Sequence, residues 1–145
     1  MACGKSRYGR EMAQRLGIRF IDLDAYIVER ERYSINEIFA ERGEGRFRQL
    51  ESRYLHEVCE LYEDFVLSTG GGTPCYNENM NYMNKQGETI FLNTDIELII
   101  SRLENDRQKR PLISRLEKGE IREYVVAHFN EREPFYRLAQ RTITP

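Results

Sequence analysis

Apolar and polar positions along this chain switch repeatedly between helical spacing and short unbroken apolar runs. Phe47, Leu50 and Tyr54 are spaced as on one side of a helix, whereas residues 65–67 form a run typical of a short buried strand. The expected helices cover residues 5–16, 24–30, 34–40, 46–61, 77–85, 95–103, 118–130 and 133–140. The expected strands cover residues 18–22, 65–69, 89–92 and 141–144.

Strands alternate with helices throughout, and this order is typical of βαβ units. Such units place parallel strands side by side and pack helices over them. The order therefore predicts an α/β fold in three layers, a sandwich whose mainly parallel sheet is covered on both faces. No repeat, low-complexity tract or linker divides the sequence, so residues 1–145 are expected to form a single domain.

Composition and charge narrow the classes of function. Of the 145 residues, 40% are hydrophobic and 32% charged, which suits a globular core and not a disordered chain. The 22 basic and 24 acidic residues give a net charge of −2, without the basic excess of nucleic-acid-binding modules. The apolar runs are far shorter than the ~20 residues of a membrane helix, and no export signal opens the chain. We therefore expect a cytoplasmic protein that binds neither nucleic acid nor membrane. Separately, we expect it to be a monomer.

A glycine-led helix start is the first candidate for chemistry. Gly4-Lys5-Ser6 opens the first expected helix, where unpaired backbone N–H groups and a partial positive charge favour phosphate. The tripeptide matches the second half of the P-loop pattern G-x-x-x-x-G-K-[ST], in which the lysine reaches the outer phosphates and the hydroxyl reaches Mg²⁺. Taken alone it is a weak signal, because it occurs by chance in many proteins.

Two carboxylates follow the first expected strand. Asp22 and Asp24 stand where the chain turns from strand to helix, so both can face the crevice beyond the strand's carboxyl end, where parallel sheets bind ligands. One could hold Mg²⁺ through water while the other accepts a hydroxyl proton. The alternative interpretation is a helix cap, a position that aspartate favours.

Glycines and arginines complete the set. The glycine run of residues 70–72 directly follows a strand and either presents backbone N–H groups to a ligand or forms a flexible turn. Arg48, Arg110 and Arg132 are candidates to bind carboxylate or phosphate, although most arginines only solvate a surface. The polar, basic residues 105–115 are expected to form a lid over a nucleotide. Together these features predict phosphoryl transfer to a small anionic alcohol.

The motifs and their order resemble those of the shikimate kinases. The resemblance spans nearly the whole chain, and the version here is most similar to that of the Bacteroides group. The matching motifs are Gly4-Lys5-Ser6, residues 20–24, residues 43–51, residues 68–72, Arg110-Pro111-Leu112 and residues 132–136. No single motif is specific to the family, but their order and spacing together are.

The resemblance implies a reaction and a fold. Shikimate kinases transfer the γ-phosphate of ATP to the 3-hydroxyl of shikimate, with Mg²⁺, in the route to chorismate and the aromatic amino acids. Their fold is that of the nucleoside monophosphate kinases, a parallel sheet with a P-loop, a lid and a substrate-binding helical region. In this chain the lid would cover about residues 105–118 and the substrate-binding helical region about residues 24–62.

On the nucleotide side, the resemblance implies that Lys5 contacts the β- and γ-phosphates as a catalytic residue. Ser6 would ligate Mg²⁺, and Asp22 would support the metal through water. Arg110 would reach the phosphates from the lid as a second catalytic residue, and Arg102 would stack on adenine. The backbone around the phosphates would come from Ala2, Cys3, Gly4, Lys5, Ser6 and Arg7. Arg7 replaces a threonine that is usual at this position in the family.

On the shikimate side, the resemblance makes Asp24 the catalytic base and a ligand of the hydroxyl groups. Arg48 and Arg132 would clamp the carboxylate, and Glu51 would orient Arg48. The Gly71 N–H would bind the ring hydroxyls. The implied glycines of the substrate site are Gly70, Gly71 and Gly72. Two arginines would explain the selection of a carboxylate-bearing alcohol over a neutral sugar.

The sequence departs from the family pattern at both ends. The family has a strand and a first P-loop glycine before the Gly-Lys-Ser motif, and it continues beyond Pro145, whereas neither stretch is present here. That strand lies in the middle of the family's sheet, so its loss is expected to leave buried strand edges with unpaired backbone groups. The sequence is interpreted as a fragment, or as one with a misassigned start, whose own turnover has to be measured.

Two alternatives remain open at this point. A related P-loop kinase, such as a gluconate kinase, also phosphorylates a carboxylate-bearing alcohol. A non-catalytic paralogue would keep the pocket as a binding module, and the first strand and glycine that are absent here favour it. Phosphorylation assays with the two alcohols distinguish the kinases, and turnover distinguishes a kinase from a binding module.

Overall fold

The computed structural model describes residues 3–106 and 113–145. Tertiary contacts divide the chain into two compact units: an N-terminal unit, Lys5–Gly87, and a C-terminal unit, in which Met1–Gly4 joins Glu88–Pro145. Each unit contains one pair of parallel strands. The expected α/β class, with parallel strands between helices, is confirmed. No helix in the described part of the chain is long and apolar enough to cross a membrane.

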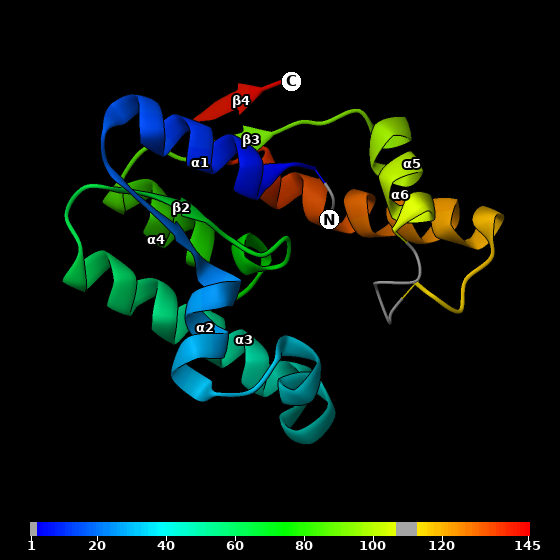
Figure 1. Cartoon of the computed structure of the whole chain (residues 1–145), viewed down its shortest axis with the longest axis horizontal. Coiled ribbons are helices and arrows are strands. Elements are labelled where there is room, and N and C mark those ends of the chain that lie inside the picture. The colour runs from blue at the N-terminus through cyan, green and yellow to red at the C-terminus, as the bar shows by residue number, and fades with distance from the viewer. Residues whose placement is uncertain (1–2, 107–112) are drawn as a thin grey trace. The chain divides into compact units, whose positions relative to one another are not determined.

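The N-terminal unit follows the predicted order of elements (Figure 1). They are α1 (Lys5–Leu16), β1 (Arg19–Asp22), α2 (Leu23–Glu31), α3 (Ile35–Leu61), β2 (Phe65–Ser68), the short 3-10 helix η1 (Thr73–Cys75) and α4 (Asn79–Gln86). The helix expected from residue 77 begins two residues later. Asn77 and Glu78 have left-handed backbone angles, with φ of 52° and 58°, and such residues do not continue a right-handed helix.

The strands β1 and β2 are parallel, with Phe20 beside Val66 and Ile21 beside Leu67. Successive side chains of a strand point to opposite faces of the sheet. The Phe20 ring lies against Gly9 of α1, whereas Leu67 packs against the core that α2 and α3 form. Helices therefore cover both faces of this strand pair, as the three-layer prediction requires.

Helix α3 carries most of the core of the N-terminal unit. It begins at a capping box, in which the Ser34 hydroxyl accepts a hydrogen bond from the Glu37 N–H and the Glu37 carboxylate accepts one from the Ser34 N–H. It kinks at Gly43, whose φ of 80° and ψ of 168° suit glycine. The two helices expected over residues 34–40 and 46–61 are therefore one kinked helix, in which Gly45 stays helical. The buried core residues are Leu23, Ile27, Ile38, Phe47, Leu50, Tyr54 and Leu55.

The C-terminal unit contains β3 (Ile90–Leu92), α5 (Ile96–Asn105), α6 (Lys118–Tyr136) and β4 (Arg141–Ile143). Its core, between α5 and α6, consists of Ile100, Leu103, Ile113, Ile121 and Val125. The two helices expected over residues 118–130 and 133–140 are one helix, so that prediction was wrong. Pro134 lies in the last turn, where a proline removes a single backbone hydrogen bond, and α6 continues past it.

The two strand pairs do not join into one sheet among the described residues. The single continuous sheet predicted from the alternation is therefore not formed by these strands. That residues 1–145 form one domain stays a prediction, and residues 107–112 of the expected lid lie outside the described residues.

The close approach of α1 to β1 generates a prediction about stability. A Cβ added at Gly9 would lie 2.7 Å from Cε2 of Phe20, so Gly9→Ala pushes the ring out of its site. We expect the free energy of unfolding in urea to fall by about 1–3 kcal/mol, the usual cost of overpacking. Gly45→Ala is the matched control, because open space surrounds that helical glycine. It should raise the free energy of unfolding by about 0.5–1 kcal/mol. A Gly9→Ala variant more stable than the wild type would contradict the packing.

Candidate active site

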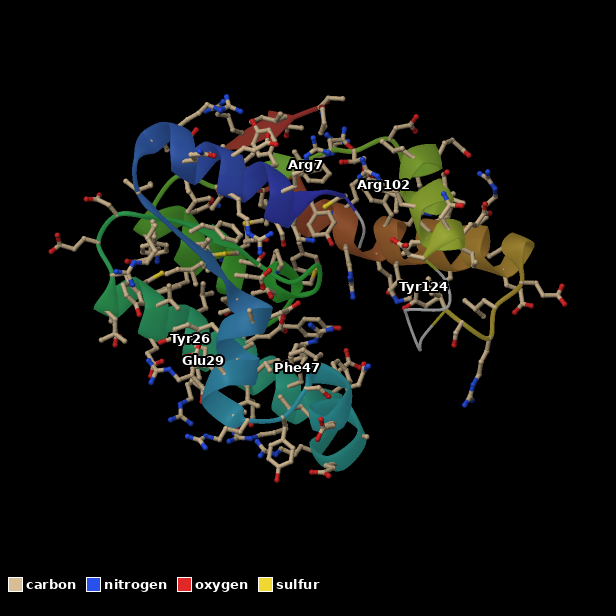
Figure 2. All side chains as sticks on the ribbon, viewed as in Figure 1. Arg7, Tyr26, Glu29, Phe47, Arg102 and Tyr124 are labelled. Carbon is tan, nitrogen blue, oxygen red and sulfur yellow. The ribbon has the colours of Figure 1, made fainter. Side chains whose placement is uncertain are left out.

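A left-handed turn at Gly4 leads the chain into α1. Its φ of 89° lies in the region that glycine adopts without strain. The Thr94 hydroxyl donates a hydrogen bond of 2.7 Å to the Cys3 carbonyl, which fixes the residue before the turn. A Cβ added at Gly4 would lie 3.7 Å from Nη1 of Arg102, which projects from α5 (Figure 2). A guanidinium therefore lies beside the turn that is expected to hold phosphate. Adenine stacking by Arg102 stays a prediction.

The two predicted metal ligands contact each other. The Ser6 hydroxyl donates to Oδ2 of Asp22 at 3.1 Å, while Oδ1 of Asp22 accepts from the Ala25 N–H at 3.1 Å. Asp22 therefore caps α2, the alternative role for this pair of acids, and also faces Ser6. Hydroxyl and carboxylate oxygens are hard ligands that suit Mg²⁺, which keeps several waters and phosphate oxygens. Among the described residues, no group of three or more His, Cys, Asp or Glu side chains is arranged to hold a metal ion. Magnesium binding by Ser6 and Asp22 stays a prediction.

The side chains around this turn differ in their surroundings. Arg7 is 87% exposed and pairs with Glu11 at 3.3 Å. Its side chain lies on the surface of α1 (Figure 2), so only its backbone remains a candidate for phosphate contact. Lys5 lies close enough to Asp24 for its positive charge to favour the ionised carboxylate and lower the pKa of Asp24.

A buried ion pair forms the centre of the N-terminal unit's polar cluster. Nη1 of Arg48 donates to Oε1 of Glu51 at 2.7 Å, and the residues are 9% and 1% exposed. The Thr73 hydroxyl donates to the other oxygen, Oε2, at 2.5 Å. The more exposed Glu44 carboxylate lies 3.3 Å from Nη2 of Arg48, whose guanidinium covers the ring of Tyr76. Burial alone lowers the pKa of Arg48, but the hydrogen bonds of the two glutamates raise it above its ordinary value.

The glycine run packs directly against this cluster. A Cβ added at Gly72 would lie 2.4 Å from Nη1 of Arg48, so the guanidinium occupies the space that a side chain would need. A Cβ added at Gly70 would lie 3.2 Å from Oδ1 of Asp24 and 3.2 Å from Oε2 of Glu51. The structure thus brings the predicted substrate residues Asp24, Arg48 and Glu51 together with the glycines. The glycines of residues 70–72 therefore let these side chains approach the backbone closely, in addition to forming a turn.

Asp24 is a carboxylate in an unfavourable environment. Its Oδ1 is buried and accepts no hydrogen bond from the residues that the structure describes. Burial raises its pKa above the ordinary value, and the negative charges of Asp22 and Glu51 raise it further, against the opposing effect of Lys5 and Arg48. A carboxyl with a raised pKa and a free buried oxygen is suited to accept a proton.

Some predicted site residues belong to the other unit or lie outside the described residues. Arg102 and Arg132 belong to the C-terminal unit, where Arg132 lies partly buried on α6. Ala2 and Arg110 lie outside the described residues. The shared site of these residues with Asp24 therefore stays a prediction.

Three polar residues of the cluster were not found from the sequence. Glu44 stood within a matching motif without a role, and Thr73 only follows the glycine run. Asn79 is fully buried, and its side-chain N–H donates to the Thr73 carbonyl at 2.9 Å. A hydroxyl directly after a glycine run was the one available signal. This signal does not indicate which acceptor the hydroxyl donates to.

The environment of Asp24 generates a prediction about stability and pH. Because the pKa of Asp24 is raised in the folded state, ionisation of this carboxyl opposes folding. The stability that the protonated carboxyl contributes is complete below the unfolded-state pKa and is lost as the pH rises through the folded-state pKa. We expect Asp24→Asn to raise the free energy of unfolding by about 1 kcal/mol at neutral pH. The gain should disappear near pH ~4, where the unfolded carboxyl protonates. Urea unfolding across this range measures it, and a gain that grows on acidification would contradict the assignment.

Comparisons with known proteins agree with this geometry. The family model described as shikimate kinase matches residues 1–144. A shikimate kinase of Bacteroides fragilis is 47% identical over 139 residues, which cover 96% of this chain and 77% of that protein. The crystal structure of the shikimate kinase from Bacteroides thetaiotaomicron has a TM-score of 0.95 at 42% identity, over 99% of this chain and 81% of that one.

A further solved structure holds a ligand. The shikimate kinase from Acinetobacter baumannii in complex with shikimate has a TM-score of 0.88 at 33% identity and covers 99% of this chain and 78% of that chain. The matches to this structure and to the family model extend over both units of the chain, and the predicted resemblance is confirmed. The chain has the P-loop kinase fold of these solved structures. It belongs to the shikimate kinase family.

Proposed function

We propose that this protein transfers the γ-phosphate of ATP to the 3-hydroxyl of shikimate. The observation that carries the proposal is the buried cluster in which Asp24 lies beside the Arg48–Glu51 pair and the glycine turn. Asp24 has a raised pKa, and its Oδ1 has no hydrogen-bond partner among the described residues. Such a cluster offers both a proton acceptor and a fixed cation to a small acidic alcohol. The family membership supports the same reaction.

The acceptor half of the reaction belongs to the cluster. Arg48 binds the substrate carboxylate together with Arg132, and Glu51 holds the Arg48 guanidinium in place. The Gly71 N–H binds the ring hydroxyls, because residues 70–72 present their backbone without side chains. Asp24 accepts the proton of the reacting hydroxyl as that oxygen attacks the γ-phosphorus. The bond between the γ-phosphorus and the bridging oxygen of the β-phosphate breaks, and ADP leaves. Its raised pKa makes it a better proton acceptor than an exposed aspartate.

The nucleotide half belongs to the start of α1. Backbone N–H groups from the Gly4 turn and the ammonium of Lys5 neutralise the phosphates, and Arg110 adds a positive charge from the lid. Ser6 and Asp22 would hold Mg²⁺, which would supply further charge neutralisation at the phosphates. Because phosphoryl transfer needs mainly alignment and charge stabilisation, this inventory of groups is sufficient. We expect the enzyme to work as a cytoplasmic monomer.

A coupled assay of ADP release tests the proposal. ADP release with shikimate and ATP, and none with gluconate, is the expected result, because two arginines and the glycine turn suit a rigid hydroxylated acid. Release with gluconate alone would favour the other kinase. A chain that binds shikimate but releases no ADP would be a binding module.

Asp24 is expected to act on the acceptor and not on the nucleotide. Asp24→Asn should lower kcat by roughly 100–10,000-fold, the usual contribution of general base catalysis, while the Kd for ATP changes by less than about twofold. Steady-state kinetics and nucleotide titration measure the two effects. Glu29→Gln, at an exposed position of the same helix (Figure 2), is the control and should behave as wild type. Weakened ATP binding with a normal kcat would contradict the role.

Arg132 is expected to hold the carboxylate of the acceptor. Arg132→Ala should raise the KM for shikimate by about 10–100-fold, the range for a lost charged hydrogen bond, and leave the KM for ATP nearly unchanged. The matched control is Arg122→Ala on the same helix, where the arginine is exposed and pairs with Glu97 at 2.6 Å. Equal increases in both KM values would place Arg132 elsewhere.

A further inference from the structure

We infer that Thr73 is a positioning residue of the shikimate site, which acts through Glu51 on Arg48. The inference rests on the proposed function and deepens it, because it names the group that fixes one side of the carboxylate clamp. The juxtaposition behind it is a chain of three buried groups, in which Thr73 donates to Glu51 and Arg48 donates to the opposite oxygen of the same carboxylate.

The burial of Glu51 makes the second hydrogen bond necessary. Glu51 is 1% exposed and Thr73 is 0% exposed, so water does not replace either partner. A buried carboxylate with one unpaired oxygen is costly, and it can relieve the cost by rotating. Rotation of Glu51 would move Oε1 and with it the guanidinium of Arg48. The hydroxyl of Thr73 therefore fixes the rotamer of Glu51 and, through it, the position of the cation.

The backbone of Thr73, which carries the hydroxyl, is held by two hydrogen bonds. The Thr73 N–H donates to the Gly70 carbonyl at 3.1 Å, and the Thr73 carbonyl accepts from the Asn79 side chain at 2.9 Å. Asn79 is fully buried at the start of α4. Both backbone groups of Thr73 are thus held, so the backbone that carries the hydroxyl is fixed.

The same hydroxyl lies next to the proposed base. A Cβ added at Gly70 would come within 3.2 Å of Oδ1 of Asp24 and Oε2 of Glu51, and within 3.3 Å of Oγ1 of Thr73. Three oxygen atoms therefore surround the Gly70 backbone. The Thr73 hydroxyl donates to Glu51. The arrangement satisfies the carboxylate that holds Arg48, whereas Oδ1 of Asp24 has no hydrogen-bond donor among the described residues.

Substitutions at Thr73 separate the hydroxyl from the packing. Thr73→Val keeps the volume and removes the donor, and we expect the KM for shikimate to rise about tenfold, as for a lost hydrogen bond to a charged group. The KM for ATP should change by less than about twofold. Thr73→Ser keeps the hydroxyl and should restore the KM for shikimate to near the wild-type value. Ile121→Val in the core of the other unit is the control for general destabilisation and should change neither KM.

A double-mutant cycle tests the route through Glu51. Glu51→Leu removes both carboxylate oxygens at similar volume, so Thr73→Val should have little further effect in that background. An undiminished effect there, or an unchanged KM for shikimate in the single variant, would overturn the inference. So would equal increases in the two KM values. If Thr73→Val does not fold, Thr73→Ala takes its place in each comparison.

A measurement that does not depend on turnover tests the inference separately from the proposed function. The Nε–H resonance of Arg48, assigned with an Arg48→Lys variant, should shift in Thr73→Val and return in Thr73→Ser. An unmoved resonance would overturn the inference, whatever the activity. A wild-type chain that does not phosphorylate shikimate would count against the proposed function alone, since the resonance still reports whether Thr73 positions the guanidinium.

Discussion

The charge of Arg48 is buried, and the burial depends on Glu51, which is buried with it. Removing Arg48 would leave a buried carboxylate without its cation, and removing Glu51 would leave Arg48 only the more exposed Glu44. Arg48 and Glu51 are three positions apart on α3, which brings their side chains to one face of the helix. The backbone at Gly72 closes the other side, within a distance that permits no Cβ. A helix, a glycine turn and a hydroxyl thus meet around one ion pair.

Asp24 shows what such a cluster costs. A carboxylate near two other carboxylates, with a buried oxygen that no described residue satisfies, weakens the fold when ionised. The same features raise its pKa and leave it ready to take a proton. Stability and reactivity therefore depend on the same atoms, which is a common property of active sites. The positive charges of Lys5 and Arg48 keep the effect within limits by favouring the ionised form.

Helices α2 and α3 are tied together at some distance from the cluster. Tyr26 of α2 donates to Glu57 of α3 at 2.5 Å, and Arg42 of α3 pairs with Glu31 of α2 at 2.6 Å. The hydroxyl of Tyr54 also donates to Glu31. These contacts, with the apolar core between the helices, fix α2 relative to α3. Because Asp24 lies on α2, whereas Arg48 and Glu51 lie on α3, such ties preorganise the site.

The sequence by itself determined the local elements and the family, because hydrophobic period, capping residues and motif order are properties of neighbouring residues. The predicted bounds of α1 and the predicted helix start near Ser34 agree with the structure, whereas the break expected between residues 130 and 133 is absent and α6 runs through Pro134. The motifs also indicated Asp24 and Glu51 as site residues. Only the tertiary structure decided that Thr73 satisfies the buried carboxylate of Glu51. Those residues are 22 positions apart, and partners at that separation are chosen by how the turn after β2 packs on α3, which no local pattern records.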